Sequence, residues 1–262
     1  GPPDHLARLR SPPTIGETDL LRRDGMWLLH AVVEVPEAAR QEPVNGFLGV
    51  DLGIVNIATT SDGDRMSGSR LNRYRKRQQR VRKRLQTKKT SSARRLLKKR
   101  RRKEQRFAAD VNHQISKRIV AEAERTGRGI AIEDLGGIRE RVRLRKPQRA
   151  TLHSWAFAQL GQFLAYKAGR AGVAFVQVDP AYTSQECNCC GWIEKNSRKS
   201  QAEFACVSCG FTCNADTNAA VNVAAGQVER PGRQARAGGM TAATGRSSIR
   251  EPQPTWAGIP LF

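Results

Sequence analysis

The sequence predicts an α/β fold with a mixed β-sheet, and two observations support that class. Apolar runs typical of buried strands occur at 46–51, 129–135 and 173–178. Segments with helical periodicity separate them, over 70–120 and 152–170. Strands that alternate with helices are typical of a sheet covered by helices. A chain of 262 residues is long enough to bury the core of such a fold.

The balance of charge narrows the possible functions. The chain carries 46 Lys and Arg against 24 Asp and Glu, which gives a formal net charge of +22 and a pI of about 10.8. Such an excess favours a polyanionic partner, and nucleic acid is the first candidate. The sequence has no run of roughly 18 or more apolar residues, so we expect no membrane-spanning helix. Residues 1–5 also lack the apolar segment of a signal peptide.

The first 40 residues are expected to contain a β-hairpin after a Pro-rich loop. Residues 25–35 have the composition of a strand that Pro36 ends, and Asp24-Gly25 supplies the turn before it. Two strands alone are marginally stable, so we interpret the hairpin as the last part of a larger β-domain. The chain does not begin with Met, which suggests a processed or excised fragment.

An acidic residue, Asp51, ends the first apolar run, and a second strand is expected at 54–60. A buried carboxylate is costly unless its charge is stabilised, so Asp51 either makes a local turn or binds a cation. The same pattern recurs at 129–135, where Glu133 and Asp134 point to opposite faces of the sheet. The residue types alone do not decide which of these two acids faces the site.

Positive charge is concentrated in residues 70–106, which contain twenty Lys or Arg and one acid, Glu104. Apolar residues at helical spacing predict a first helix, and the segment Thr90-Ser91-Ser92 is expected to cap a second helix that runs from near Ala93 past Ile119. Like charges four residues apart destabilise a helix. A solvated helical hairpin is therefore the weaker interpretation, and sequence-independent contact with nucleic acid is the stronger. The expected contacts are Arg73, Arg77, Arg80, Arg84, Lys88, Arg95, Lys99 and Arg102.

The six cysteines all lie within residues 187–213, which favours a metal site in a reducing compartment over dispersed disulfides. Two Cys-x2-Cys pairs in this segment have the spacing of a closed, structural four-thiolate zinc site. Gly191 and Gly210 follow the two pairs, where a tight turn favours glycine. Cys189 and Cys213 are left over. The expected zinc ligands are Cys187, Cys190, Cys206 and Cys209.

The rest of the chain supplies two helices and a tail. The helix before the last strand is expected to bury Trp155 and Phe157 in the core. An Ala-rich helix over 215–225 carries Asp216 in its first turn, where the acid either complements the helix dipole or adds a third carboxylate to a metal site. Residues 226–262 have no periodicity and are expected to form a disordered basic tail.

Three motifs are distinctive in combination. They are Gly49-Val50-Asp51-Leu52-Gly53, Ile132-Glu133-Asp134-Leu135, and Tyr182-Thr183-Ser184-Gln185 leading through both cysteine pairs to Ala215-Asp216. Together they resemble the TnpB family of transposon-encoded proteins, which are relatives of the type V CRISPR effectors. The resemblance extends over roughly residues 20–225.

The resemblance implies an α/β fold of the RNase H-like (RuvC) type, divided by insertions. A RuvC-like nuclease domain would occupy 41–183 with a basic helical insertion at 70–120, and a zinc ribbon would occupy 184–213 before the last RuvC segment at 214–225. Residues 1–40 would be the C-terminal part of a β-barrel wedge domain. Family members carry a recognition lobe and the first part of that wedge domain before the nuclease, whereas only about forty residues precede Gly46 here.

The resemblance also implies an activity, which is RNA-guided cleavage of DNA by a transposon-encoded endonuclease. Asp51, Glu133 and Asp216 would be the catalytic acids and would hold two Mg²⁺ ions, which need oxygen ligands and would relieve the repulsion among the carboxylates. The partners would be a guide RNA from the transposon end and target DNA. A monomer in the prokaryotic cytoplasm, associated with the nucleoid, is expected.

Two other functions are compatible with the residues. One is a non-cleaving nucleic-acid-binding protein, either a transposon accessory protein or a guided repressor. The other is a transposase acting on its own ends, which is less favoured because the sequence has no separate end-binding module. The presence of all three acids favours the nuclease.

Overall fold

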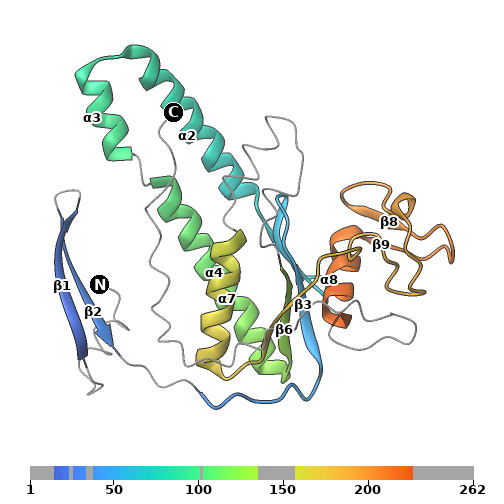
Figure 1. Cartoon of the computed structure of the whole chain (residues 1–262). Coiled ribbons are helices and arrows are strands. Elements are labelled where there is room, and N and C mark those ends of the chain that lie inside the picture. Colours follow the sequence, from blue (N-terminus) through green and yellow to red (C-terminus); the bar gives the residue numbers. More distant parts are fainter. Residues whose placement is uncertain (1–14, 24–25, 34–37, 101–102, 135–156, 227–262) are drawn as a thin grey trace.

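The computed structural model describes residues 15–23, 26–33, 38–100, 103–134 and 157–226 (Figure 1). Its centre is a five-stranded sheet with the strand order β5-β4-β3-β6-β7. The middle strand, β3, pairs antiparallel with β4 and parallel with β6, so the sheet is mixed, as predicted. The strands are β3 (Phe47–Asp51), β4 (Asn56–Thr60), β5 (Arg65–Ser67), β6 (Gly129–Glu133) and β7 (Phe175–Val178).

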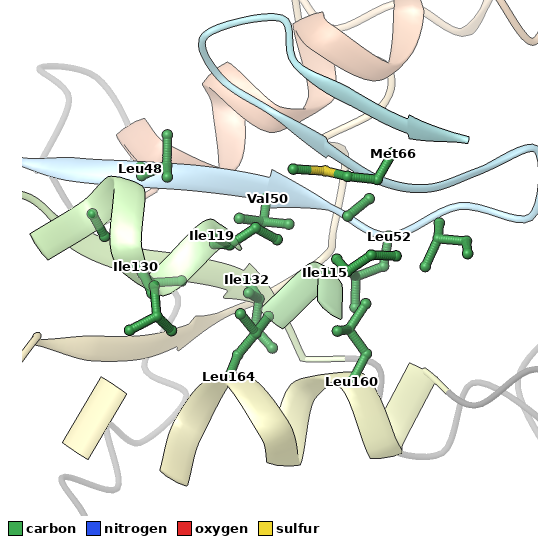
Figure 2. Close-up of a cluster of buried hydrophobic side chains, with 14 of the residues drawn as sticks. Leu48, Val50, Leu52, Met66, Ile115, Ile119, Ile130, Ile132, Leu160 and Leu164 are labelled. Atoms are coloured by element: carbon green, nitrogen blue, oxygen red, sulfur yellow. The ribbon is translucent and has the colours of Figure 1, made fainter. Parts of the chain in front are cut away.

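Helices cover both faces of this sheet. Helices α4 (Lys103–Thr126) and α7 (Phe157–Ala171) lie side by side on one face, and α8 (Ala215–Ala225) lies on the other (Figure 1). The core between the sheet and the α4–α7 layer is apolar (Figure 2). A fully buried Leu or Ile in such a core contributes about 1.5–3 kcal/mol. Its buried residues include Leu48, Val50, Ile115, Ile119, Ile130, Ile132, Leu160 and Leu164.

Side-chain alternation along the strands explains the two layers. In β3, Leu48 and Val50 point toward α4 and α7, which leaves Gly49 and Asp51 on the side of α8. A β-carbon on Gly49 would lie 1.9 Å from the carbonyl oxygen of Ala220. The absence of a side chain therefore allows α8 to pack directly on the central strand.

The basic segment folds into helices that extend beyond the sheet (Figure 1). The first is α2 (Ser69–Lys88), and it is followed by α3 (Ser91–Arg100). The predicted cap in the segment 90–92 is provided by Thr90, which accepts a hydrogen bond from the backbone N–H of Ala93, although the helix begins at Ser91 and not near Ala93. The prediction of one continuous helix from Ala93 past Ile119 is wrong. The structure has two helices, α3 and α4, on either side of residues 101–102, which lie outside the described residues.

Glu104, at the start of α4, forms ion pairs with α2. Its carboxylate lies 3.6 Å from Arg75 Nε and 3.3 Å from Arg82 Nη2. Nearby, Arg100 donates a hydrogen bond to Gln78, whose side chain is buried. The one acid of the basic segment thus joins the start of α4 to one side of α2.

A separate hairpin is formed by β1 (Ile15–Arg23) and β2 (Met26–Val33), which confirms the predicted strand pairing (Figure 1). Its Asp24-Gly25 turn lies outside the described residues. The same holds for Trp155, for the side chain of Phe157 and for the tail beyond Gly226.

Strand β7 leads into a small unit with the two-stranded sheet β8 (Glu203–Ala205) and β9 (Thr212–Asn214). The unit then continues directly into α8. Within the described ranges, no helix is both long enough and apolar enough to cross a membrane.

Candidate active site and metal centre

Three carboxylates meet at one edge of the central sheet. Asp51 ends β3 and Glu133 ends β6, and these two strands run parallel side by side, so their carboxyl ends lie at the same edge. Asp216 enters from the first turn of α8, which packs on β3. The charges of Glu133 and Asp216 both act on Asp51. The structure therefore brings together the three acids that the sequence singled out, although they are far apart along the chain.

Side-chain alternation along β6 decides which of Glu133 and Asp134 faces α8. Ile130 and Ile132 point into the core beneath α4 and α7, whereas Ala131 packs with Val223 of α8 on the other face. Glu133 shares the face of Ala131 because side chains alternate along a strand. Asp134 is the next residue, so it points to the opposite face, and it is exposed. Glu133 is thus the acid on the side of α8.

The surroundings of Asp51 disfavour its ionised form. Burial is the largest cause, and with the charges of Glu133 and Asp216 it raises the pKa of Asp51 to about 8, while Arg198 acts in the opposite direction. Burial also raises the pKa of Glu133, against a hydrogen bond from Thr183 and the charge of Arg198. Carboxylates whose charged forms are disfavoured in this way are suited to binding a cation.

Asp216 is buried and held by contacts from two other parts of the chain. Its Oδ2 accepts a hydrogen bond of 3.0 Å from Asn56 Nδ2, and its Oδ1 lies 3.4 Å from Arg198 Nη2. The helix N-terminus is capped by Asn214, which accepts hydrogen bonds from the backbone N–H groups of Asp216 and Thr217. The Asp216 side chain is therefore turned toward the other acids, and the cap is a different residue.

Sequence reasoning missed three residues of this site, which are Asn56, Thr183 and Arg198. Each is a common polar residue, and its contact is with a residue distant in the chain. Thr183 does lie in one of the three distinctive motifs, but the motif alone assigns it no role.

The second candidate centre is the four-cysteine group. The Sγ atoms of Cys187, Cys190, Cys206 and Cys209 all lie within 4.8 Å of one another. The separations are 3.8 Å between Cys187 and Cys209 and 3.6 Å between Cys190 and Cys206. Four sulfurs at about 2.3 Å from a zinc ion in a tetrahedron would be about 3.8 Å apart. The group could therefore hold a metal ion such as zinc.

The two cysteine pairs have the same backbone geometry. Gly191 N–H donates to Cys187 O, and Gly210 N–H donates to Cys206 O, at 2.8 and 3.1 Å. Both glycines have positive φ, 74° and 73°, which favours glycine and confirms the predicted turns. The backbone N–H of Cys209 is the main cause that lowers the pKa of Cys206 to about 6, so this thiol ionises readily. Cys189 is exposed and lies outside the group.

The two centres differ in how closely their ligands converge. Among the described residues, the four cysteines are the one group of three or more candidate ligands that is compact enough for a single ion. The carboxylates interact electrostatically without forming so compact a group. A two-ion site needs ligands spread over about 3.5–4 Å between metals, which a wider carboxylate arrangement can serve.

The predicted nucleic-acid contacts lie mostly on one side of α2. Arg73, Arg77, Arg80, Arg84 and Lys88 are spaced by three or four residues and are exposed. Arg95 and Lys99 on α3 are also exposed, whereas Arg102 lies outside the described residues. The opposite side of α2 carries Leu71, Gln78 and the arginines that contact Glu104.

Two family models relate parts of the chain to transposon-encoded and Cas12f1-like proteins. The family model OrfB_IS605, described as "Probable transposase", matches residues 30–136, and the model "Cas12f1-like, TNB domain" matches residues 157–223. Together the two matches include all three acids and all four zinc-ligand candidates.

Individual relatives make the relationship more specific. The chain is 39% identical over 47% of its length to a "CRISPR-associated endodeoxyribonuclease Cas12f1" of Sulfoacidibacillus thermotolerans, and covers 28% of that protein. It is 28% identical over 87% of its length to the "Putative RNA-guided DNA endonuclease InsQ" of Escherichia coli, and covers 59% of it. It is 27% identical over 80% of its length to "TnpB-like protein MJ0751" of Methanocaldococcus jannaschii, and covers 77% of it.

A solved structure supports the same fold. The cryo-EM structure of a Cas12f1–sgRNA–target DNA complex matches 79% of this chain and 55% of the Cas12f1 chain, with a TM-score of 0.53 and 20% identity. The family models and the sequence relatives confirm the resemblance to TnpB-like proteins that was read from the motifs, and the solved structure supports the shared fold. It spans only part of the length of the first relatives that it matches.

Proposed function

We propose that this chain contains the nuclease centre of an RNA-guided, transposon-encoded DNA endonuclease. The observation that carries the proposal is the meeting of Asp51, Glu133 and Asp216 at one edge of the sheet, with the pKa of Asp51 raised to about 8 by burial and by the other two charges. Relatives named as RNA-guided DNA endonucleases and TnpB-like proteins support it.

The donor set fits Mg²⁺. All three side chains offer carboxylate oxygens, the ligands that hard divalent cations prefer. Cations bound there would supply an activated water and would stabilise the leaving oxygen during phosphodiester cleavage. Asp51, whose ionised form is disfavoured by both other acids, would hold these cations together with Glu133 and Asp216. Arg198 contacts Asp216 in the structure and adds a fixed positive charge beside the acids.

The remaining assignments follow from the same proposal. The RuvC-like domain would occupy 41–183 with its last segment at 214–225, the ribbon at 184–213 would hold one structural zinc ion, and the hairpin within 1–40 would belong to a wedge domain. The exposed arginines of α2 would contact the nucleic-acid backbone, while base pairing with a guide RNA from the transposon end would select the DNA. Such a protein would act as a monomer on DNA at the nucleoid.

The nuclease proposal is tested by comparing variants of the adjacent acids Glu133 and Asp134. The chain is purified with co-expressed transposon-end RNA, and cleavage of matching DNA is measured with Mg²⁺. Glu133→Gln and Asp51→Asn should each reduce the rate by about 10³-fold or more, equivalent to roughly 4 kcal/mol of activation free energy. Asp134→Asn should cut at close to the normal rate, because its side chain is exposed on the other side of the strand.

Binding is measured in parallel, since the acids should not be needed for it. Affinity for nucleic acid should stay within about twofold in all three variants, because phosphate contacts come from the basic residues. Cleavage by Asp51→Asn at the normal rate would overturn the nuclease site. Tight binding without cleavage by the unmodified chain would favour the guided repressor instead.

A further inference from the structure

The loop between β7 and the cysteine ribbon contacts the carboxylate site through Thr183. This side chain is buried, and its Oγ1 donates to Glu133 Oε1, with the backbone carbonyl oxygen of Pro180 as a second, more distant acceptor at 3.1 Å. Within the described part of the chain, the other carboxylate oxygen, Oε2, has no hydrogen-bond partner. Thr183 therefore holds one oxygen of Glu133 and leaves the other available.

Thr183 is in turn held by α8. The Asn222 side chain donates to the backbone carbonyl of Thr183 at 2.9 Å and to that of Glu186 at 2.7 Å. One turn earlier, Asn218 donates to Glu186 O at 2.7 Å and accepts from the backbone N–H of Asn188 at 3.1 Å. Both asparagines are almost fully buried, with 0% exposure for Asn218 and 3% for Asn222. Buried amides that satisfy backbone groups in this way give a segment one defined position.

These contacts connect α8 to two of the three acids. The helix carries Asp216 itself, and through Asn222 and Thr183 it also reaches Glu133. The loop is thus tied to α8 on one side and to the end of β6 on the other. A shift of the loop would move the Thr183 hydroxyl away from Glu133.

We propose that Thr183 is a positioning residue for divalent-cation binding, and that Asn222 holds it in place. The Thr183 hydroxyl fixes Glu133 Oε1, so that the carboxylate presents Oε2 toward the cation site at the ends of β3 and β6. Partners that orient metal ligands typically change metal affinity by about 10–100-fold. This inference rests on the proposed function, because it assumes that the three carboxylates bind divalent cations.

The experiment measures Mn²⁺ binding to the full, zinc-loaded chain by calorimetry, without nucleic acid or cleavage. Thr183→Val removes the hydroxyl at nearly constant volume and should weaken Mn²⁺ affinity about tenfold or more. Thr183→Ser keeps the hydroxyl and should bind within about threefold of the normal affinity. The matched control is Thr87→Val, whose hydroxyl donates to a carbonyl of its own exposed helix and which should bind Mn²⁺ normally.

A double-mutant cycle separates positioning from general loosening of the fold. In the Glu133→Gln background, Thr183→Val should cause no further loss of Mn²⁺ affinity, because the carboxylate that it orients is gone. Zinc content should be unchanged, because the four cysteines are not altered. If Thr183→Val does not fold, Thr183→Ala serves in the same cycle.

The Mn²⁺ affinities distinguish a failure of the proposed cation site from a failure of the role assigned to Thr183. Equal Mn²⁺ binding by the unmodified chain and by Asp51→Asn would overturn the proposed function. Weaker binding by Asp51→Asn together with normal binding by Thr183→Val would overturn this inference alone. A further loss of affinity in the Glu133→Gln background would also overturn it, because the effect would not pass through Glu133.

Discussion

Asp51 is a single acid at the end of an apolar strand in the sequence, but in the fold it is desolvated by its surroundings and lies beside two other carboxylates. Its strand neighbours are apolar, its side chain points toward α8, and two further carboxylates lie close to it. Desolvation and like charges both disfavour the ionised form. The positive charge of Arg198 only partly opposes them. A bound divalent cation would reverse this balance, since it favours all three carboxylates in their ionised state.

The raised pKa predicts how cation binding depends on pH. Below about pH 8 a cation must displace the proton of Asp51, so Mg²⁺ affinity should rise by up to about tenfold per pH unit toward pH 8 and level off above it. Calorimetry between about pH 6 and 9, in buffers of different ionisation enthalpy, would measure the proton released. Asp51→Asn should remove most of this dependence. Affinity that is independent of pH in the unmodified chain would contradict the prediction.

The same shift has a consequence for stability without cations. The unfolded carboxyl ionises near its usual value of about 3.9, whereas the folded one keeps its proton up to about pH 8. The unfolded chain therefore loses its proton first, and the contribution of Asp51 to stability falls as the pH rises from about 4 to 8.

At the scale of elements, α8 and the ribbon before it act together. The ribbon ends at β9, Asn214 caps α8, and Asp216 follows within the first turn. Arg198, which contacts Asp216, also lies in the ribbon between the two cysteine pairs. The packing of α8 on Gly49 places the helix at a short distance from β3. The position of the third acid thus depends on the ribbon as well as on the sheet.

This dependence predicts that loss of zinc will weaken the carboxylate site. Cys206→Ser should lower the zinc content from about one ion per chain, unfold the ribbon and reduce Mn²⁺ affinity about tenfold or more, because Asp216 and Arg198 lose their support. Elemental analysis and calorimetry measure the two effects. Cys189→Ser is the matched control, since Cys189 is exposed and outside the cluster. Normal Mn²⁺ binding by a zinc-free Cys206→Ser chain would refute the coupling.

At the scale of the whole molecule, the excess positive charge lies apart from the three candidate acids. The net charge of +22 is concentrated in the segment that forms α2 and α3, which extends away from the sheet (Figure 1). One side of α2 is held by apolar residues and Glu104, so the arginines on its other side are presented to solvent. A surface of one sign repels itself and is stabilised when phosphates neutralise it.

The arginines of α2 should therefore dominate the salt dependence of nucleic-acid binding. Replacing Arg73, Arg77, Arg80 and Arg84 together by Gln should make the slope of log affinity against log salt concentration less negative by about 3 to 4, at about 0.9 for each phosphate that is no longer neutralised. Arg118→Gln/Arg125→Gln is the control, because these arginines are paired with Asp64 and Glu122. Equal slopes in the fourfold variant and the unmodified chain would remove α2 from the interface.

Much of the fold was predictable from local patterns. The strands that end in Asp51 and Glu133, the helix that carries Asp216 and the two cysteine turns all lie where periodicity and spacing placed them. Local patterns report these features because side-chain alternation and turn geometry are properties of a few consecutive residues. The excess of Lys and Arg likewise pointed to a polyanionic partner without any structure.

The tertiary structure alone decided which groups meet. It placed Glu133 rather than Asp134 on the side of α8, brought Asn56 to Asp216 across 160 positions of the chain, and set Thr183 against Glu133. Such contacts depend on strand order, on register and on the close packing that Gly49 permits, none of which a local pattern contains. The sequence by itself therefore determined the elements and the candidate acids. The pairing of β3 with β6 and the packing of α8 on β3 determined that these acids lie close together.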